Sequence, residues 1–315
     1  MDVPGVLDMK FNPEMTGQHH TLAVALSDGT LTMLPLNLSD IGSNVWKEGE
    51  RLLIDQESTI CLSVDWSNQM IADPDPMIAV SLSNGEMAVC GNRDGALSTL
   101  HKWKAHTLPY VNTPAEVWIT SFDPNDNNCV FSGGDDGLLK QWDLRMVDDY
   151  AHPVCINRDA EAGVTSMCWN KYRSDYITVG SYDGHVRLYD KRAMKHCVQD
   201  LDVENNAGIW RIKYKRNCNY YYDRAHGIHW ENSSTQHEML LAAMRAGFLV
   251  VDSNDADGNG FVKKVEYLKQ GGEALAYGVD YIYVDSDDKK EGFAGSCSFY
   301  NHLMHVWDYQ YLLVC

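Results

Sequence analysis

Side chains that could do chemistry gather in or beside short predicted turns of this 315-residue sequence. Imidazole and carboxylate groups serve acid–base catalysis, guanidinium groups hold anions, and aromatic faces attract cations. Aspartates also suit turns for their own backbone reasons. A turn role explains Trp210, Arg211 and His302 less well. The alternative to a functional role for these three residues is packing or a local hydrogen bond. The candidates are Asp135, Asp136, Asp183, Trp210, Arg211, Arg245, Tyr300, Asn301 and His302.

The turns belong to a repeated phrase, in which two apolar runs flank a turn and the second ends on an aromatic residue and an aspartate. The clearest copies are residues 129–143 and 176–190, and a third ends at Asp308. The turn glycines, with a histidine in the last copy, stand at positions 29, 85, 137, 184, 247 and 302. A hairpin repeat of this length is typical of a β-propeller.

Each hairpin follows another strand-like run, such as VLDMKF or GIWRIKY, and a fourth, weaker strand fits before each run, for example residues 96–106. The sequence therefore predicts an all-β propeller with six visible four-stranded blades, forming one domain over residues 1–315. A β-sandwich, the alternative, has no reason to repeat a Trp-Asp ending. The hairpin turns are expected at Asp28-Gly29, Asn84-Gly85, Asp136-Gly137, Asp183-Gly184, Ala246-Gly247 and Asn301-His302.

The order of the hairpins also fixes the direction of every strand. Asp183, Trp210, Arg211 and His302 each fall at the same end of their predicted blades. We therefore expect them on one face of the propeller, near the mouth of its central channel.

The composition limits the possible partners. Lys and Arg number 26 against 44 Asp and Glu, a formal charge of −18, which argues against nucleic-acid binding because phosphate contacts need a basic face. No signal-peptide core opens the sequence and no apolar run approaches a membrane span, so no membrane partner is expected. The nine cysteines are scattered without a CxxC pair, which favours reduced thiols in the cytoplasm.

The common enzyme signatures are missing, and no cofactor is expected. The sequence has neither a P-loop nor a dinucleotide fingerprint. Gly180-Ser-Tyr-Asp-Gly184 superficially resembles a nucleophile elbow, but its serine is misplaced. His302 and His305 would face opposite sides of a strand and are not expected to share a metal.

Two segments depart from the repeat. The residues between Tyr214 and Met239 form a polar and aromatic insertion, which is expected to be a surface loop. Residues 255–266 match a calcium-loop pattern, with Asp255, Asp257 and Glu266 as potential ligands. The preceding residues read as a repeat hairpin rather than as a helix, so an acidic loop is expected there and a helix over 240–251 would overturn the register.

Several motifs in order identify a resemblance to a known family. SGGDDGLLKQWDLR and VGSYDGHVRLYDKR are followed by WRIKY, AAMRAGF and CSFYNH. Together they resemble the diphthine methylesterase (methylated-diphthine methylhydrolase) family of WD-repeat propellers, from about Val6 to Tyr309. The first of these motifs is common among WD-repeat proteins, whereas the last three are more specific.

The resemblance implies a reaction and a partner. The family acts in diphthamide biosynthesis, removing the methyl ester from methylated diphthine on translation elongation factor 2. The family is seven-bladed, whereas only Met1 to Gly5 precede VLDMKF here. The N-terminal blade is therefore expected to be missing, with an open or poorly closed gap between the strand at Val6 and the last blade.

Ester hydrolysis suggests roles for the candidates. His302 would be the base and Asp183 would orient it. Arg211 or Arg245 would hold a carboxylate or oxyanion, and Trp210 or Tyr300 would bind the fixed cation of diphthine. Cys297 and Ser298 are possible nucleophiles, although strand cysteines are usually buried and inert. Both a covalent mechanism and direct attack by water stay open.

The rival interpretation is a non-catalytic WD-repeat adaptor, such as a substrate receptor of a cullin-type ubiquitin ligase. Residues 142–145 and 189–192 resemble the WDxR element of such receptors. The simpler alternative is that Arg145 and Arg192 pair with acidic neighbours. An esterase needs a cluster of perturbed titratable groups, whereas an adaptor does not.

Overall fold

The described part of the chain is built almost entirely of β-strands. In this computed structural model the single helical element described is a 3-10 turn, η2 (Leu144–Met146). The chain divides into two compact units, Met1–Arg158 and Asp159–Cys315, and each is described by itself. The described residues are 4–13, 19–37, 49–56, 58–148, 151–170, 173–203, 207–214, 220–223, 227–230, 238–253, 261–267, 275–286, 289–300 and 302–308.

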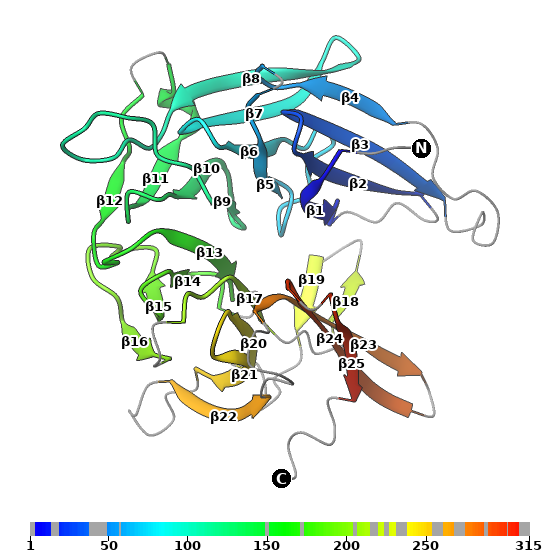
Figure 1. The fold of residues 1–315 in the computed structure, drawn as a ribbon. Coiled ribbons are helices and arrows are strands. Elements are labelled where there is room, and N and C mark those ends of the chain that lie inside the picture. Colours follow the sequence, from blue (N-terminus) through cyan, green and yellow to red (C-terminus); the bar gives the residue numbers. More distant parts are fainter. Residues whose placement is uncertain are drawn as a thin grey trace. The chain divides into compact units, whose positions relative to one another are not determined.

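The first unit holds three four-stranded antiparallel sheets, ordered as they follow in the chain (Figure 1). The first sheet contains β1 (Val6–Phe11), β2 (His19–Leu26), β3 (Thr30–Asn37) and β4 (Glu50–Leu53). The second contains β5 (Cys61–Trp66), β6 (Ile78–Leu82), β7 (Glu86–Arg93) and β8 (Ala96–Lys104). The third contains β9 (Ile119–Asp123), β10 (Asp126–Gly133), β11 (Leu139–Asp143) and β12 (Cys155–Asn157).

In the described residues of the second unit, three sheets repeat this pattern, and a separate two-stranded sheet lies in the insertion. The first of the three sheets contains β13 (Val164–Trp169), β14 (Tyr176–Ser181), β15 (His185–Asp190) and β16 (Gln199–Asp202). The next contains β17 (Arg211–Tyr214), β20 (Glu238–Ala243), β21 (Gly247–Asp252) and β22 (Val262–Tyr267). The last has three described strands, β23 (Ala276–Ser286), β24 (Lys289–Ser298) and β25 (Met304–Asp308).

The five predicted hairpin turns that contain a glycine are confirmed by the backbone, whereas Asn301 of the sixth lies outside the described residues. All five turn glycines have positive φ angles, from 72° at Gly137 to 93° at Gly247, and His302 has a φ of 53°. Tight hairpins need this conformation, which glycine adopts without a Cβ clash. The strands at Glu238–Ala243 and Gly247–Asp252 exclude a helix over residues 240–251.

The fourth strand of each repeat was predicted on the wrong side. Residues 96–104, expected to precede the next run, form β8 and pair with β7, so they complete the sheet before them. Asp94 and Gly95 cause this arrangement, because their φ angles of 56° and 86° make a tight hairpin between β7 and β8.

The core lies between the faces of successive sheets. In the first unit, Trp66, Val80 and Leu31 belong to one buried cluster, while Phe122 and Trp142 belong to another. In the second unit the fit between sheets is tight at Gly180, where an added Cβ would lie 2.5 Å from Cγ2 of Ile209. The apolar strands are therefore buried on both faces, as stacked blades require.

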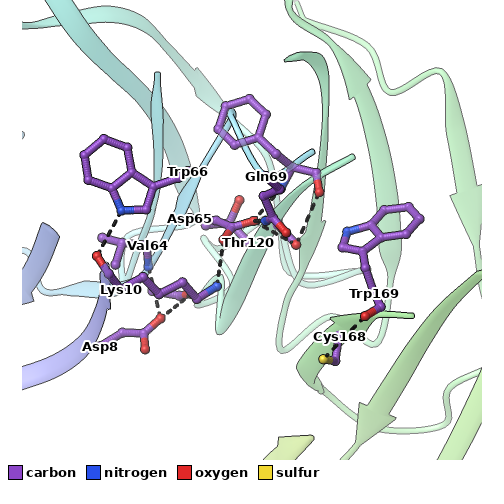
Figure 2. Close-up of polar contacts among 12 residues, drawn as sticks. Asp8, Lys10, Val64, Asp65, Trp66, Gln69, Thr120, Cys168 and Trp169 are labelled. Atoms are coloured by element: carbon purple, nitrogen blue, oxygen red, sulfur yellow. Dashed lines mark hydrogen bonds and ion pairs between the residues drawn. The ribbon is translucent and has the colours of Figure 1, made fainter. Parts of the chain in front are cut away.

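Buried polar groups connect the first strands of neighbouring sheets in the first unit (Figure 2). Lys10 Nζ in β1 lies 2.9 Å from Asp65 Oδ1 in β5, and Trp66 Nε1 donates to the carbonyl of Lys10. Asp65 Oδ2 accepts from Ser121 Oγ and from the amide of Phe122 in β9. These contacts link the first strands of the three sheets, β1, β5 and β9, at corresponding positions.

Both departures from the repeat contain strands. The insertion after Tyr214 includes a hairpin of β18 (Tyr220–Asp223) and β19 (Gly227–Trp230), more regular than the predicted loop. The calcium-like motif follows β21, and its last residues, including Glu266, form most of β22, whereas its residues 255–260 lie outside the described residues. The single domain over 1–315, the missing blade and the gap beside the last blade stay predictions.

Candidate functional site

The predicted site residues of the second unit lie at matching ends of its three sheets. Arg211 begins β17 and pairs with Ala242 at the end of β20, beside the turn that carries Arg245. Ala276 pairs with Ser298 in the same way, beside the β24–β25 connection that carries Tyr300 and His302. Asp183 lies in the β14–β15 turn. The repeated register thus puts each of these residues at the turn end of its own sheet.

Backbone hydrogen bonds join these ends from sheet to sheet. The amide of Ile209, which precedes β17, donates to the carbonyl of Ser181 at the end of β14. The amide of Ala276 donates to the carbonyl of Met244 in the β20–β21 turn, at 2.9 Å. Residues that are distant in the sequence are therefore neighbours along one rim of the second unit.

Five aromatic rings form a chain along this rim, which we call the aromatic strip. The strip consists of Tyr182, Trp210, Tyr277, Phe299 and Tyr300. Successive ring centroids are 6.0, 4.9, 5.3 and 5.3 Å apart. The three sheets each contribute rings, and Tyr182, Phe299 and Tyr300 are exposed. A row of aromatic rings, three of them exposed, is an environment in which a cation can be bound.

Tyr277 occupies the centre of the strip and is partly covered. Burial raises the pKa of its phenol, and the positive charge of Arg211 and a hydrogen bond with the Trp210 side chain act in the opposite direction. Because an indole N–H can only donate, Tyr277 accepts this bond. The strip thus has a guanidinium beside it, while Arg245 is exposed in the β20–β21 turn.

Asp183 is held by groups of its own blade. Its carboxylate accepts from Ser181 Oγ, from the amides of Glu161 and His185, and from Arg187, whose Nη2 is 2.9 Å from Oδ2. Burial alone would raise its pKa, but these donors hold the pKa below the ordinary value. No described contact joins Asp183 to His302, and the orienting role stays a prediction.

His302 and Tyr300 are exposed in the β24–β25 connection. Nearby, Cys297 near the end of β24 is exposed as well, so the expectation that this thiol is buried is wrong. Cys297 pairs with Gly278, and its Sγ lies over that glycine, where an added Cβ would be 2.6 Å away. Ser298 is half-buried, and its amide donates to the carbonyl of Leu303.

The first unit contains a set of side chains that resembles a serine-hydrolase triad. His106 Nδ1 lies 2.7 Å from Asp136 Oδ1, and His106 Nε2 lies 2.7 Å from Ser132 Oγ. All three side chains are buried, and Ser132 Oγ also accepts from Trp142 Nε1 at 2.8 Å. An ester cannot reach this hydroxyl, so the set holds β10 and β11 together and is not a reaction centre.

This network also separates Asp136 from the other candidate residues. The sequence made it a candidate turn residue beside Asp135, but the Asp136 carboxylate is fully buried, whereas Asp135 is exposed. Burial lowers the pKa of His106, which is therefore neutral at pH 7. Burial would raise the pKa of Asp136, but the His106 hydrogen bond and the charge of Lys140 keep it low.

The two WDxR-like motifs carry local ion pairs. Arg145 Nε and Nη2 bind both carboxylate oxygens of Asp143, and Arg192 binds Asp190 in the same way. Pairing with an acidic neighbour thus accounts for both arginines without a ubiquitin-ligase partner.

Sequence reasoning missed three members of the aromatic strip, namely Tyr182, Tyr277 and Phe299. Each is adjacent to a predicted candidate or opens a predicted run: Tyr182 precedes Asp183, Phe299 precedes Tyr300, and Tyr277 is in the ALAYGVDY run. An aromatic residue at the same end of three successive repeats was the available signal.

Comparison with known proteins supports the repeat architecture. The WD domain, G-beta repeat family matches residues 97–143 and 153–190. A chain in the crystal structure of a mitotic checkpoint complex aligns with a TM-score of 0.59 at 13% identity, covering 91% of this chain and 71% of that one. The predicted fold class, a WD-repeat β-propeller with six visible blades, is thereby confirmed. Among the described residues, no helix has the length and apolar character to cross a membrane.

The diphthine methyltransferases among the relatives by sequence match nearly the whole chain. The diphthine methyltransferase homolog of Dictyostelium discoideum is 28% identical over 96% of this chain and 76% of its own length. The diphthine methyltransferase of Homo sapiens is 28% identical over 90% of this chain, which spans 57% of that protein. The E3 ubiquitin-protein ligase COP1 of Arabidopsis thaliana is 31% identical, but over only 27% of this chain.

Proposed function

Since the chain is a WD-repeat β-propeller protein homologous to the diphthine methyltransferases, we propose that it is an enzyme of diphthamide biosynthesis. Its substrate would be translation elongation factor 2 carrying methylated diphthine, and its reaction would be hydrolysis of the methyl ester. Because that factor acts in translation, the proposed compartment is the cytoplasm. The observation that supports a reaction site at one particular position is the aromatic strip beside Arg211.

The strip fits the charged part of this substrate. Methylated diphthine has a quaternary ammonium group, which cannot donate a hydrogen bond and is attracted to aromatic faces. Trp210 and Tyr300 are the proposed contacts, and Tyr182, Tyr277 and Phe299 extend the surface. Hydrolysis then converts a cationic ester into a zwitterion, whose new carboxylate suits Arg211 or Arg245.

His302 is the proposed general base. It would take a proton from water while the oxygen bonds to the ester carbonyl carbon, and Arg211 or Arg245 would stabilise the resulting oxyanion. The bond to the methoxy oxygen then breaks, and methanol leaves with a proton. Asp183 is the proposed orienting carboxylate. In the covalent alternative, Cys297 or Ser298 attacks first and water then releases the acyl group.

The name of the relatives favours a second candidate, in which a methyl group is transferred to diphthine. The two reactions run in opposite directions at the same carboxyl group, so one experiment separates them. The protein is incubated with elongation factor 2 purified in the methyl-ester state or in the free-acid state, the latter with S-adenosylmethionine. Mass spectrometry of the modified peptide then reports the change.

Hydrolysis predicts loss of one CH2 unit from the ester and release of methanol, without a methyl donor. Gain of one CH2 unit by the free acid, dependent on the donor, would replace hydrolysis by transfer. No change in either arm, with binding of the factor retained, would favour the non-catalytic adaptor. For variants of the proposed site, Met146→Ser serves as a matched control, because it alters an exposed side chain of the other unit.

A further inference from the structure

The loop between β8 and β9 forms a rigid projection from the first unit. We call residues Thr107–Pro114 the Tyr110 loop; it is the teal segment after β8 in Figure 1. Its two arms are joined by a bridge between Thr107 and Pro114, and the amide of Leu108 donates to the carbonyl of Thr113 at 2.9 Å. The loop is thus closed on itself rather than spread over the surface.

The base of the Tyr110 loop is fixed to the sheet ends. The amides of Ala105 and His106 both donate to the carbonyl of Gly85, and the amide of Val117 donates to Leu82. The backbone of Gly85 lies close to the loop, because an added Cβ would be 2.6 Å from the carbonyl oxygen of His106. The ends of the loop are therefore attached to the sheets by several backbone contacts.

The tip of the loop presents apolar side chains that the fold does not use. Tyr110 has a relative exposure of 104%, and Val111 is 63% exposed. Tyr110 has a φ of 74° and Asn112 a φ of 54°, a conformation that costs free energy for a bulky residue. The side chain of Tyr110 recovers none of this cost by burial within the described structure.

The charge around the loop indicates what it would meet. Residues 107–115 carry no charge in a protein of net charge −18. At the base stand two carboxylates, Glu116 and Asp135, whose backbones are joined by a 2.9 Å hydrogen bond. Burial and the negative charge of Asp135 raise the pKa of Glu116. A loop with an apolar tip and two carboxylates where it leaves the sheets complements an apolar pocket that is bordered by positively charged side chains.

We propose that the Tyr110 loop is an exosite that docks the folded protein substrate, with Tyr110 inserted into an apolar pocket bordered by Lys or Arg side chains. The substrate is elongation factor 2, so this inference rests on the proposed function. A rigid aromatic anchor loses little conformational entropy on binding, and Tyr is enriched among the residues that dominate binding energy. The loop would add affinity for the whole factor and none for a short modified peptide.

The test measures binding of purified elongation factor 2 to immobilised protein. Tyr110→Asn removes the ring with a residue that tolerates positive φ, Tyr110→Phe keeps the ring, and Met146→Ser removes another exposed apolar side chain. Tyr110→Asn is expected to weaken the Kd by about tenfold or more. Tyr110→Phe and Met146→Ser should bind as the unchanged protein does, and added salt should weaken binding.

Equal binding by Tyr110→Asn would overturn the docking role, as would a complete absence of binding by the unchanged protein. A change in self-association of Tyr110→Asn, measured by sedimentation, would assign the loop to contacts between copies instead. Hydrolysis of a short methyl-ester peptide is followed separately and should be the same in all variants. Tyr110-dependent binding without any hydrolysis would leave the docking role standing and reject the proposed reaction.

Discussion

The indole ring of Trp210 lies 4.9 Å from the phenol ring of Tyr277 between centroids, at an interplanar angle of 32°, and the two residues belong to neighbouring sheets. Each ring would be an ordinary half-buried aromatic side chain alone. Together they join the rings of three blades into one surface, with Arg211 at its side.

Removing the indole should weaken binding of the quaternary ammonium group. Trp210→Ala is expected to raise KM for a methyl-ester peptide by about 2- to 30-fold, because a cation–π contact contributes ~0.5–2 kcal/mol. The kcat should change little, since the contact is present before and during the reaction. Trp210→Phe retains a ring and should lie in between; a variant whose kcat falls while KM is unchanged would argue against this role.

Replacing His302 should abolish hydrolysis without unfolding the protein. Because His302 has a φ of 53°, Asn is a better substitute than Ala, since it tolerates this conformation. His302→Asn is expected to lower kcat by ~10² to 10⁴, the usual contribution of a general base. Circular dichroism and the melting temperature check the fold. If His302→Asn keeps the kcat of the unchanged enzyme, His302 is not the general base.

Ser132→Ala should reduce stability rather than catalysis. Without the hydroxyl, His106 Nε2 and Trp142 Nε1 would each lack a buried partner, at a cost of about 1–3 kcal/mol per group. Urea unfolding should show this loss, and Ser132→Thr should restore much of the stability. Activity per folded molecule should remain the same. A fall of several orders of magnitude would mean that the buried triad is catalytic after all.

The same network should make stability depend on pH. The pKa of His106 is lowered in the folded state, so the unfolded chain takes up a proton first as pH falls below about 6.5. The contribution of neutral His106 is therefore present above that pH and is lost progressively below it. The lowered pKa of Asp136 acts in the same direction at lower pH.

Urea midpoints measured between pH 8 and pH 5 test this dependence. His106→Gln, which has no titratable group, should be less stable at pH 8 and should show a flatter profile below about pH 6.5. Equal slopes for both proteins would assign the pH dependence to other residues.

Much of the fold was predictable because its signals are local. Asp-Gly and Asn-Gly pairs supply the positive φ of a tight hairpin whatever surrounds them, and the turns at Gly29, Gly85 and Gly184 were confirmed for this reason. The one local signal overlooked, Asp94-Gly95, led to the misplacement of β8. Pairing across a turn needs no knowledge of distant residues.

From the sequence, the site was predictable only as a set of residues that lie at the same end of their repeats. The sequence by itself determined that Trp210, Arg211 and His302 fall at one end of their repeats, because the hairpin order sets strand direction. Only the tertiary structure decided that Tyr182, Tyr277 and Phe299 join the rings into a strip, and that Asp136 is buried with Ser132. Such contacts depend on how sheets stack, and side-chain packing between segments far apart in the sequence leaves no local pattern.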